Sequence, residues 1–274
     1  MTKTVLLIGG DGFIGTHLKQ KLTDQGHSVN VIDKKSNRDI NNEYSFITDI
    51  NFSHVVFLAA EANLKAVKQN PKEAIKTMTS GLMNSLINYP QAHFTYISSS
   101  MVYGNWDSDS VHEYSAKAPI DLYGQLKLAG EGIVRELHDH WTIIRPTAVY
   151  GSNDDPRRVM PFFIERARNN ETLTVKGHSN RLDFTHVDDV VAGIILGMSS
   201  TENRVYNISY GNAVHLENVA KYICEKVGSG TVKVELADMD YPKRGTMCVE
   251  KAKLELGYQP SIDVFAGIDQ LIQG

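Results

Sequence analysis

The sequence is poor in cysteine, has no surplus of positive charge and contains no long hydrophobic segment. Two cysteines in 274 residues cannot form a disulfide framework, so a reducing cytoplasm is the expected compartment. The formal net charge of -4 argues against nucleic acid or an anionic membrane surface as a partner. The apolar run near 190–197 is far too short to span a bilayer. The N-terminus leads directly into a predicted strand, so no signal peptide is expected.

The remaining composition is typical of a globular protein. Hydrophobic residues make up 42% of the chain and charged residues 22%, and the length allows one large domain or two coupled ones. The ten histidines do not cluster at the spacing of metal ligands, and the two cysteines lie far apart. No metal site is therefore expected.

The first 150 residues alternate short β-branched runs with longer helical patterns. This rhythm predicts an α/β fold, a Rossmann-type doubly wound parallel sheet. Strands are expected at 5–8, 28–32, 44–48, 54–58, 94–97 and 141–144, and helices at about 12–25, 62–88 and 121–139.

Beyond residue 151 the regular alternation ends, which indicates a smaller α/β lobe interleaved with the first. We expect a dinucleotide-binding domain over 1–151 plus about 182–209, and a substrate-binding lobe over 152–181 and 210–274. Helices are predicted at 162–169, 188–198 and 215–227, and strands at 173–176 and 205–208.

Three glycines, Gly9, Gly12 and Gly15, lie between the first predicted strand and the first predicted helix, with Phe13 and Ile14 among them. Glycine permits the tight turn and the close approach of backbone to a pyrophosphate. The N-terminus of the helix then offers free N–H groups to the phosphates. This context predicts a dinucleotide site, and a plain strand–helix turn is the alternative reading.

Asp33 closes the second predicted strand, where a carboxylate can accept hydrogen bonds from the adenosine ribose. It would repel a 2′-phosphate and so favours NAD over NADP. Lys34 and Lys35 follow and weaken that preference, unless they are only solvated surface charges. Asp49 and Ile50, after the predicted strand at 44–48, could reach the adenine or could form an ordinary turn.

Tyr123 and Lys127 are four residues apart in a predicted helix and therefore share one face. A tyrosine needs a positive neighbour to act as a base near neutral pH, because its ordinary pKa is about 10. Ser99 lies upstream in a serine-rich strand end, between Ser98 and Ser100, and can hydrogen-bond a reacting oxygen. A buried tyrosine beside a surface lysine is the alternative reading.

These motifs together give a specific resemblance. The chain resembles the extended short-chain dehydrogenase/reductases, particularly nucleotide-sugar epimerases and reductases, almost from end to end. The motifs that carry the resemblance lie at 9–15, 58–60, 98–104, 123–127, 145–151, 183–190 and 254–260.

The resemblance implies NAD as cofactor and Ser99, Tyr123 and Lys127 as the catalytic triad. It also implies a homodimer, formed through the helices at 62–88 and 121–139. Further cofactor-binding residues would be Phe13, Ile14, Leu58, Ala59, Ala60, Ser98 and Pro146. The substrate would contact Ser99 and Ser100, and the nucleotide diphosphate would contact Arg181 and Arg244.

The leading functional reading is epimerisation of a nucleotide-activated sugar through a transient keto intermediate, with hydride transfer to and from bound NAD. The alternative is an NAD(P)H-dependent 4-keto-sugar reductase that uses the same residues. A third reading is a non-catalytic cofactor-sensing protein, because fold alone does not fix function. Ser100 and Met101 stand where sugar dehydratases carry an Asp-Glu pair, so dehydration is not expected.

Overall fold

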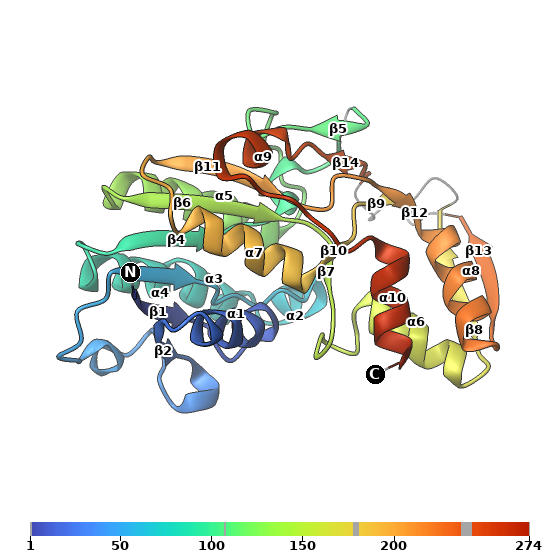
Figure 1. The fold of residues 1–274 in the computed structure, drawn as a ribbon, viewed down its shortest axis with the longest axis horizontal. Helices are drawn as coiled ribbons and strands as arrows, with labels where there is room; N and C mark the ends of the chain where they lie inside the picture. The colour runs from blue at the N-terminus through green and yellow to red at the C-terminus, as the bar shows by residue number, and fades with distance from the viewer. Residues whose placement is uncertain (1, 107, 178–180, 237–242, 274) are drawn as a thin grey trace.

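The structure is a computed structural model that describes residues 2–106, 108–177, 181–236 and 243–273. A parallel six-stranded sheet lies at its centre, in the order β11-β6-β4-β3-β1-β2 (Figure 1). Its strands are β1 (Thr4–Ile8), β2 (Ser28–Ile32), β3 (His54–Phe57), β4 (His93–Ile97), β6 (Trp141–Pro146) and β11 (Arg204–Ile208). The predicted doubly wound α/β fold is confirmed.

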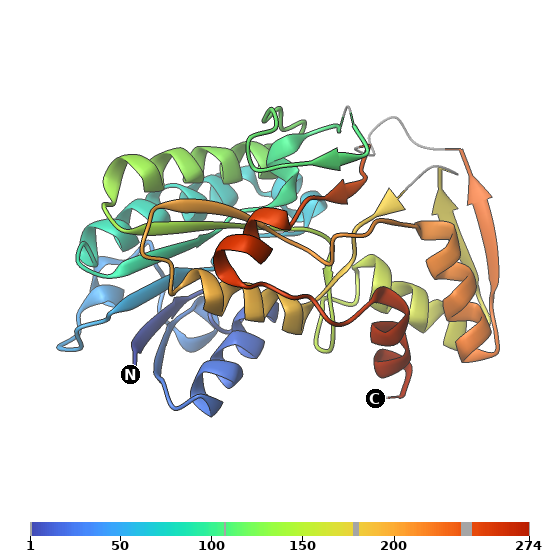
Figure 2. The same cartoon turned by 45° about the horizontal axis from the view of Figure 1, so that its top comes forward.

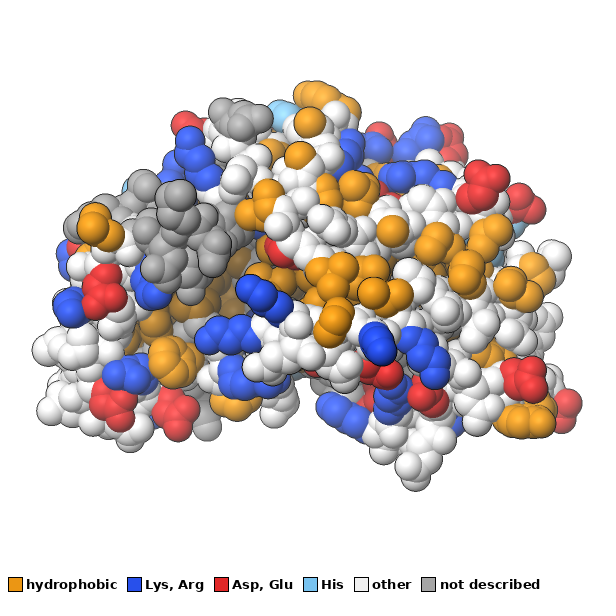
Figure 3. Space-filling model, turned by 180° about the vertical axis from the view of Figure 1, so that it is seen from behind, with side chains coloured by type: hydrophobic (Ala, Val, Ile, Leu, Met, Phe, Trp, Pro, Cys, Tyr) orange, Lys and Arg blue, Asp and Glu red, His pale blue; other side chains and the backbone are white. Residues whose placement is uncertain are grey.

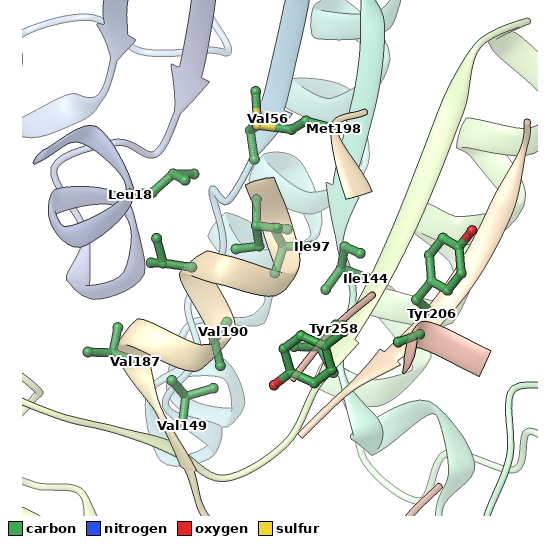
Figure 4. Packing of buried hydrophobic residues seen from close by; sticks show 14 of the residues in the cluster. Leu18, Val56, Ile97, Ile144, Val149, Val187, Val190, Met198, Tyr206 and Tyr258 are labelled. Carbon is green, nitrogen blue, oxygen red and sulfur yellow. The ribbon is translucent and has the colours of Figure 1, made fainter. Parts of the chain in front are cut away.

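Helices cover both faces of this sheet, which explains why its strands read as continuous apolar runs. In β1, Val5 and Leu7 pack beneath α1 (Phe13–Asp24) and α7 (Val187–Gly197). Figure 4 shows Leu18 of α1 and Val190 of α7 in the same apolar layer. Leu6 and Ile8 pack on the other side, with α4 (Ser80–Asn88) and α5 (Leu122–Leu137). All four of these β1 side chains are fully buried.

The segment predicted as one helix at 62–88 is three helices, α2 (Leu64–Gln69), α3 (Pro71–Met78) and α4. Pro71 is the first residue of α3, where its missing N–H costs nothing, and Asn70 before it leaves the helical region with φ -129° and ψ 64°. The proline therefore ends α2 and starts α3 in a new direction.

The strand predicted at 44–48 is wrong. These residues form part of the 3₁₀ helix η2 (Glu43–Phe46), which the Asn42 side chain begins by accepting the N–H of Tyr44. Tyr44 and Ile47 are 70% and 73% exposed, whereas the adjacent Ser45 and Phe46 are both buried. The alternating burial that a strand requires is absent here, so β2 forms the edge of the sheet.

The C-terminal lobe has its own apolar core, between paired strands and three helices (Figure 2). Its strands β8 (Thr172–Lys176) and β13 (Thr231–Glu235) run parallel. Its helices are α6 (Val159–Arg168), α8 (Leu216–Val227) and α10 (Val264–Gln273). Helix α9 (Glu250–Leu256) lies within the segment assigned to this lobe, yet its Ala252 packs in the core of the main sheet.

The remaining elements are short. They are η1 (Lys34–Ser36), η3 (Ser100–Tyr103), β5 (Ser110–Val111), β7 (Val149–Tyr150), β9 (Arg181–Leu182), β10 (Thr185–His186), β12 (Val214–His215) and β14 (Thr246–Met247). Across the part of the chain that the structure describes, no helix combines the length and apolar character needed to cross a membrane.

Asp183 joins the segments that run between the two lobes. Its side chain is buried and accepts hydrogen bonds from the Ser209 hydroxyl at 3.0 Å, the Met247 N–H at 2.9 Å and the Gly211 N–H at 3.1 Å. These bonds satisfy backbone N–H groups of two other segments, the chain just after β11 and the chain at Met247, so Asp183 serves the structure of this junction.

Candidate active site

A cavity of about 670 Å³ lies at the carboxyl ends of the parallel strands, where ligands bind in open α/β sheets. Its walls come from the ends of β1, β2, β3, β4 and β6, from α5, and from the loop before α6. The expected cofactor residues that line it are Gly9, Gly12, Phe13, Ile14, Gly15, Asp33, Leu58, Ala59, Ala60, Ser98, Tyr123, Lys127 and Pro146.

The glycine turn at one wall has no room for side chains. Gly9 has φ +83°, and a Cβ placed there would lie 2.6 Å from the Ala59 nitrogen. A Cβ on Gly15 would lie 2.6 Å from the Gly10 carbonyl oxygen. Gly12 is the N-cap residue of helix α1, which has no side-chain cap and no acidic residue in its first turn. Its first N–H groups can therefore hold a diphosphate, and the turn fits a dinucleotide.

Asp33 is held firmly at one end of the cavity, the end at which the adenosine of the cofactor is expected (the adenosine end). Its Oδ1 accepts the Lys35 N–H at 2.9 Å, and its Oδ2 accepts the Asp11 N–H at 3.1 Å. Each carboxylate oxygen keeps a further lone pair for a ribose hydroxyl.

The two lysines after Asp33 already have partners. Lys34 forms an ion pair with Glu73 of α3, and its Nζ lies 3.7 Å from the nearer carboxylate oxygen of Asp39. The Lys35 ammonium donates to the Asp11 carbonyl at 2.8 Å. Both lysines line the cavity, but their charge is directed at groups of the protein itself.

Asp49 and Ile50 do not line the cavity. Arg38 and Ile40, from the same connection between β2 and β3, line this end instead. Arg38 is fixed there because it donates to the carbonyls of Val31 and Ser45. The one sequence signal for this wall is Ile40, an isolated apolar residue within a polar stretch.

Ser99, Tyr123 and Lys127 meet at the other end of the cavity. Ser99 follows β4, and the Asp121 side chain caps α5 by accepting the Gly124 N–H at 2.8 Å, which places Tyr123 in the first turn. Burial raises the pKa of Tyr123 to about 12, while a side-chain hydrogen bond from Ser99 acts in the opposite direction. In the free protein the phenol is therefore protonated and can serve as an acid.

Lys127 is almost fully buried, with 2% of its surface exposed. Its ammonium donates to the Ile97 carbonyl at 2.6 Å and lies 5.7 Å from the centre of the Tyr123 ring. Burial lowers the pKa of Lys127 to about 7, and the charge of Glu131 works against this shift. The lysine is thus close to the phenol, and near neutral pH its amine can exist in the charged or the neutral form.

Several residues of the site were not foreseen. Arg158 lines the cavity, and its positive charge favours ionisation of Tyr123. Arg158 itself lies 3.4 Å from Asp154, whose pKa burial raises to about 6. Glu131 and Arg145 form a buried ion pair at 2.7 Å behind Lys127. Charged residues without a motif look like surface residues in a sequence, and only the fold brings them here.

Three expected substrate residues do not line the cavity. The Ser100 hydroxyl hydrogen-bonds the Thr147 hydroxyl at 3.0 Å. Arg181 donates to the Ala213 carbonyl at 3.1 Å, and Arg244 donates to the Gly104 carbonyl at 2.6 Å. Both arginines are held by backbone oxygens of the C-terminal half or of the loop after β4. Among the described residues, no three His, Cys, Asp or Glu side chains gather as a possible metal site.

Comparisons with solved structures show close similarity over the whole chain. A UDP-glucose 4-epimerase from Thermotoga maritima, solved with UDP-glucose, gives a TM-score of 0.90 at 26% identity, covering 98% of this chain and 97% of that one. The protein MoeE5, solved with UDP-glucose and NAD, gives a TM-score of 0.89 at 25% identity, with the same two coverages.

Two sequence relatives are an epimerase and a decarboxylase of UDP-glucuronate. UDP-glucuronate 4-epimerase 5 from Arabidopsis thaliana is 27% identical, over 98% of this chain and 74% of that protein. UDP-glucuronic acid decarboxylase 1 from Xenopus tropicalis is 28% identical, over 98% and 71%. Residues 5–209 match the model of the NAD dependent epimerase/dehydratase family. The match covers more than half of the chain and confirms the expected resemblance, so this protein belongs to the NAD dependent epimerase/dehydratase family of enzymes.

Proposed function

We propose that this protein is an NAD-dependent epimerase of a UDP-activated sugar. The observation that carries the proposal is the meeting of Ser99, Tyr123 and Lys127 in the cavity that also holds the glycine turn. Solved relatives with UDP-glucose and NAD, and curated relatives that epimerise UDP-glucuronate, support both the cofactor and the substrate class.

The residues divide the chemistry between them. Tyr123 takes the proton of the reacting sugar hydroxyl and later returns it, and Ser99 holds that oxygen by a hydrogen bond. The charge of Lys127 lowers the cost of forming the phenolate. Bound NAD would supply the hydride acceptor and donor for the same carbon, so that the hydride can return on the other face of the sugar. Because the proton and the hydride are both returned to the sugar, the net change is the inversion of one stereocentre.

The cofactor would lie along the cavity from Asp33, past the glycine turn, to Lys127. Its ribose would bind Asp33, its diphosphate the N–H groups at the start of α1, and its nicotinamide the wall of Leu58, Ala59 and Pro146. We assign Arg158 to the substrate side of the cavity, because its charge acts on Tyr123. Arg181, Arg244 and Ser100 remain proposed substrate residues, which would have to exchange their present partners.

A keto-sugar reductase would use the same residues, so the cofactor balance decides between the two reactions. The purified protein is denatured and the released nucleotide identified, and a panel of UDP-hexoses and UDP-hexuronates is then tested. We expect NAD to be released and a 4-epimer to form without net change in NADH absorbance. Consumption of NADH in proportion to product would favour the reductase. No turnover with any sugar, in a protein that binds NAD, would favour the cofactor-sensing reading.

We also propose a homodimer formed through the helices at 62–88 and 121–139, which are α2, α3, α4 and α5. Apolar side chains gather on the face of the molecule in Figure 3, and exposed apolar residues of these helices include Ile75, Met83, Ile87 and Leu137. Pairing of two copies would bury them in a symmetric interface. Light scattering that gives the monomer mass of 30.5 kDa at micromolar concentration would reject this assembly.

A further inference from the structure

A buried ion pair lies directly behind the catalytic residues. The side chains of Glu131 and Arg145 are 0% and 1% exposed. Arg145 donates Nε to Oε1 at 2.8 Å and a terminal nitrogen to Oε2 at 2.7 Å, the two-pronged geometry of a strong pair. Burying two charges costs about as much as their attraction returns, so such a pair is weak evidence for a role in stability. Its contacts indicate another role.

The pair ties together the two strand ends that carry the site. Glu131 Oε1 also accepts the Ser98 hydroxyl at 2.7 Å, and Ser98 precedes Ser99 at the end of β4. Arg145 lies near the end of β6, next to Pro146, and donates to the Tyr103 hydroxyl at 2.8 Å. One carboxylate on α5 thus holds both strand ends at the catalytic wall of the cavity.

Glu131 also stands one helical turn after Lys127 on α5, and its charge acts on the lysine. From β4, Lys127 faces the Ile97 carbonyl and the Tyr96 ring, whose centre is 5.2 Å from Nζ. From its own helix it faces Tyr123, at 5.7 Å.

Other charges surround the carboxylate of Glu131. The charged groups that face it are Arg145 on β6, Arg135 on α5 at 3.1 Å, and Lys117 in the loop before α5. All three are cations. Because Glu131 is the charge that raises the pKa of Lys127, removing its carboxylate would leave the lowering effect of burial unopposed by it.

We propose that Glu131 is a positioning residue of the active site: it holds the Ser98–Ser99 end of β4 against α5 and keeps Lys127 in its ammonium form beside Tyr123. This inference rests on the proposed function only for the measurement of turnover. Burial lowers the pKa of Lys127 to about 7, so a small change in nearby charge decides whether the lysine is protonated under physiological conditions.

The test follows Lys127 directly. Wild-type protein and variants are labelled with ¹³Cε-lysine, and the Lys127 resonance is assigned by its loss in Lys127→Met and titrated. In Glu131→Gln, which keeps the shape and removes the charge, we expect the midpoint to fall by about one pH unit or more. Glu131→Asp keeps the charge with a shorter reach, and its midpoint should stay near the wild-type value. With a UDP-sugar, the matching inflection in the pH profile of kcat should move in the same direction.

Two further variants keep the test decisive. Glu131→Gln can fail to fold because Arg145 would be buried without its partner, and Glu131→Gln combined with Arg145→Gln removes both charges. Asp183→Asn is the matched control: another buried carboxylate is lost, stability falls, and the Lys127 midpoint stays in place.

An unchanged Lys127 midpoint in a folded Glu131→Gln protein or in the double variant would overturn the proposal and leave Glu131 a purely structural role. A shifted midpoint supports it, even in a protein that turns over none of the sugars tested. In that case the proposed epimerase activity fails and the inference about Glu131 stands.

Discussion

The two ends of the cavity use charged residues in opposite ways. At the catalytic end, Lys127 and Glu131 are buried, and they are linked to the strand ends by hydrogen bonds. At the adenosine end, the Lys34 and Glu73 side chains are 51% and 45% exposed. Charges interact strongly in the protein interior and weakly in water. Changes at the catalytic end should therefore alter rate and pH response, whereas water should compensate for the loss of the exposed Lys34–Glu73 pair at the adenosine end.

The largest effect is expected for Tyr123→Phe, which removes one oxygen and leaves the ring volume almost unchanged. Turnover of the sugar nucleotide should fall by about 10²–10⁴-fold through the loss of acid–base catalysis. Binding of NAD and the unfolding transition should stay near their wild-type values. Tyr114→Phe is the matched control, because Tyr114 is 82% exposed and does not line the cavity. Wild-type turnover by a folded Tyr123→Phe protein would refute the assignment of the site.

Lys127→Met should reduce turnover but stabilise the fold. Burial lowers the pKa of Lys127 from 10.5 to about 7, so below pH 7 the folded protein must hold a desolvated ammonium. Methionine should raise the free energy of unfolding at pH 7 by about 1–3 kcal/mol.

The size of the stabilisation by Lys127→Met depends on pH. Between about pH 7 and 10.5 the unfolded wild type binds a proton that the folded protein lacks, so wild-type stability gains with rising pH. The advantage of Lys127→Met should therefore shrink over that range. Urea denaturation at pH 7 and pH 9 measures it, with the exposed Lys68→Met as control. A Lys127→Met protein less stable than wild type at pH 7 would mean that the hydrogen bond to Ile97 outweighs desolvation.

Asp33→Ala should weaken NAD by about 10- to 100-fold, the range for hydrogen bonds to a charged group. NADP should be affected less, because a 2′-phosphate no longer meets a carboxylate. Titration calorimetry with both cofactors measures the two affinities. Asp39→Ala removes a nearby carboxylate that does not line the cavity and should change neither affinity much. Tighter binding of NADP than NAD by the wild type would show that Lys34 and Lys35 outweigh Asp33.

The smallest effect is expected for Lys34→Met, which breaks the exposed pair with Glu73. The change in NAD affinity should be less than about 1 kcal/mol and should diminish as salt is added. Lys72→Met, an exposed lysine of the same helix as Glu73, is the control. An effect as large as that of Asp33→Ala would remove the contrast between the two ends of the cavity.

The sequence predicted the sheet and brought Ser99, Tyr123 and Lys127 to one wall of the cavity because both predictions rest on local signals. Continuous apolar runs marked the buried strands, and the spacing of Tyr123 and Lys127 put them on one helical face. The false strand at 44–48 arose because Tyr44 and Phe46 favour strands by composition, whereas the Asn42 cap decides the conformation. Placing Asp49 and Ile50 at the adenine depended on that strand.

The parts that were not predicted depend on distant contacts. Glu131 and Arg145 are 14 positions apart, and although Arg145 opens the motif at 145–151, nothing in the sequence identifies Glu131 as its buried partner. Arg158 stands in a polar loop whose path is set by the C-terminal lobe. In the structure, Arg181 and Arg244 donate to backbone carbonyls and do not line the cavity, a placement that resemblance could not reveal.

The position of β11 has a consequence for how the chain folds. The strand pairs with β6, with Val205 beside Ile143, although the chain builds α6, β8 and α7 between them. During synthesis, the edge of β6 therefore stays open until residue 208 has left the ribosome. Closing so long a loop is slow, and an unpaired apolar edge can pair with other chains. Nascent or truncated chains that end before β11 should thus be the forms that depend most on chaperones.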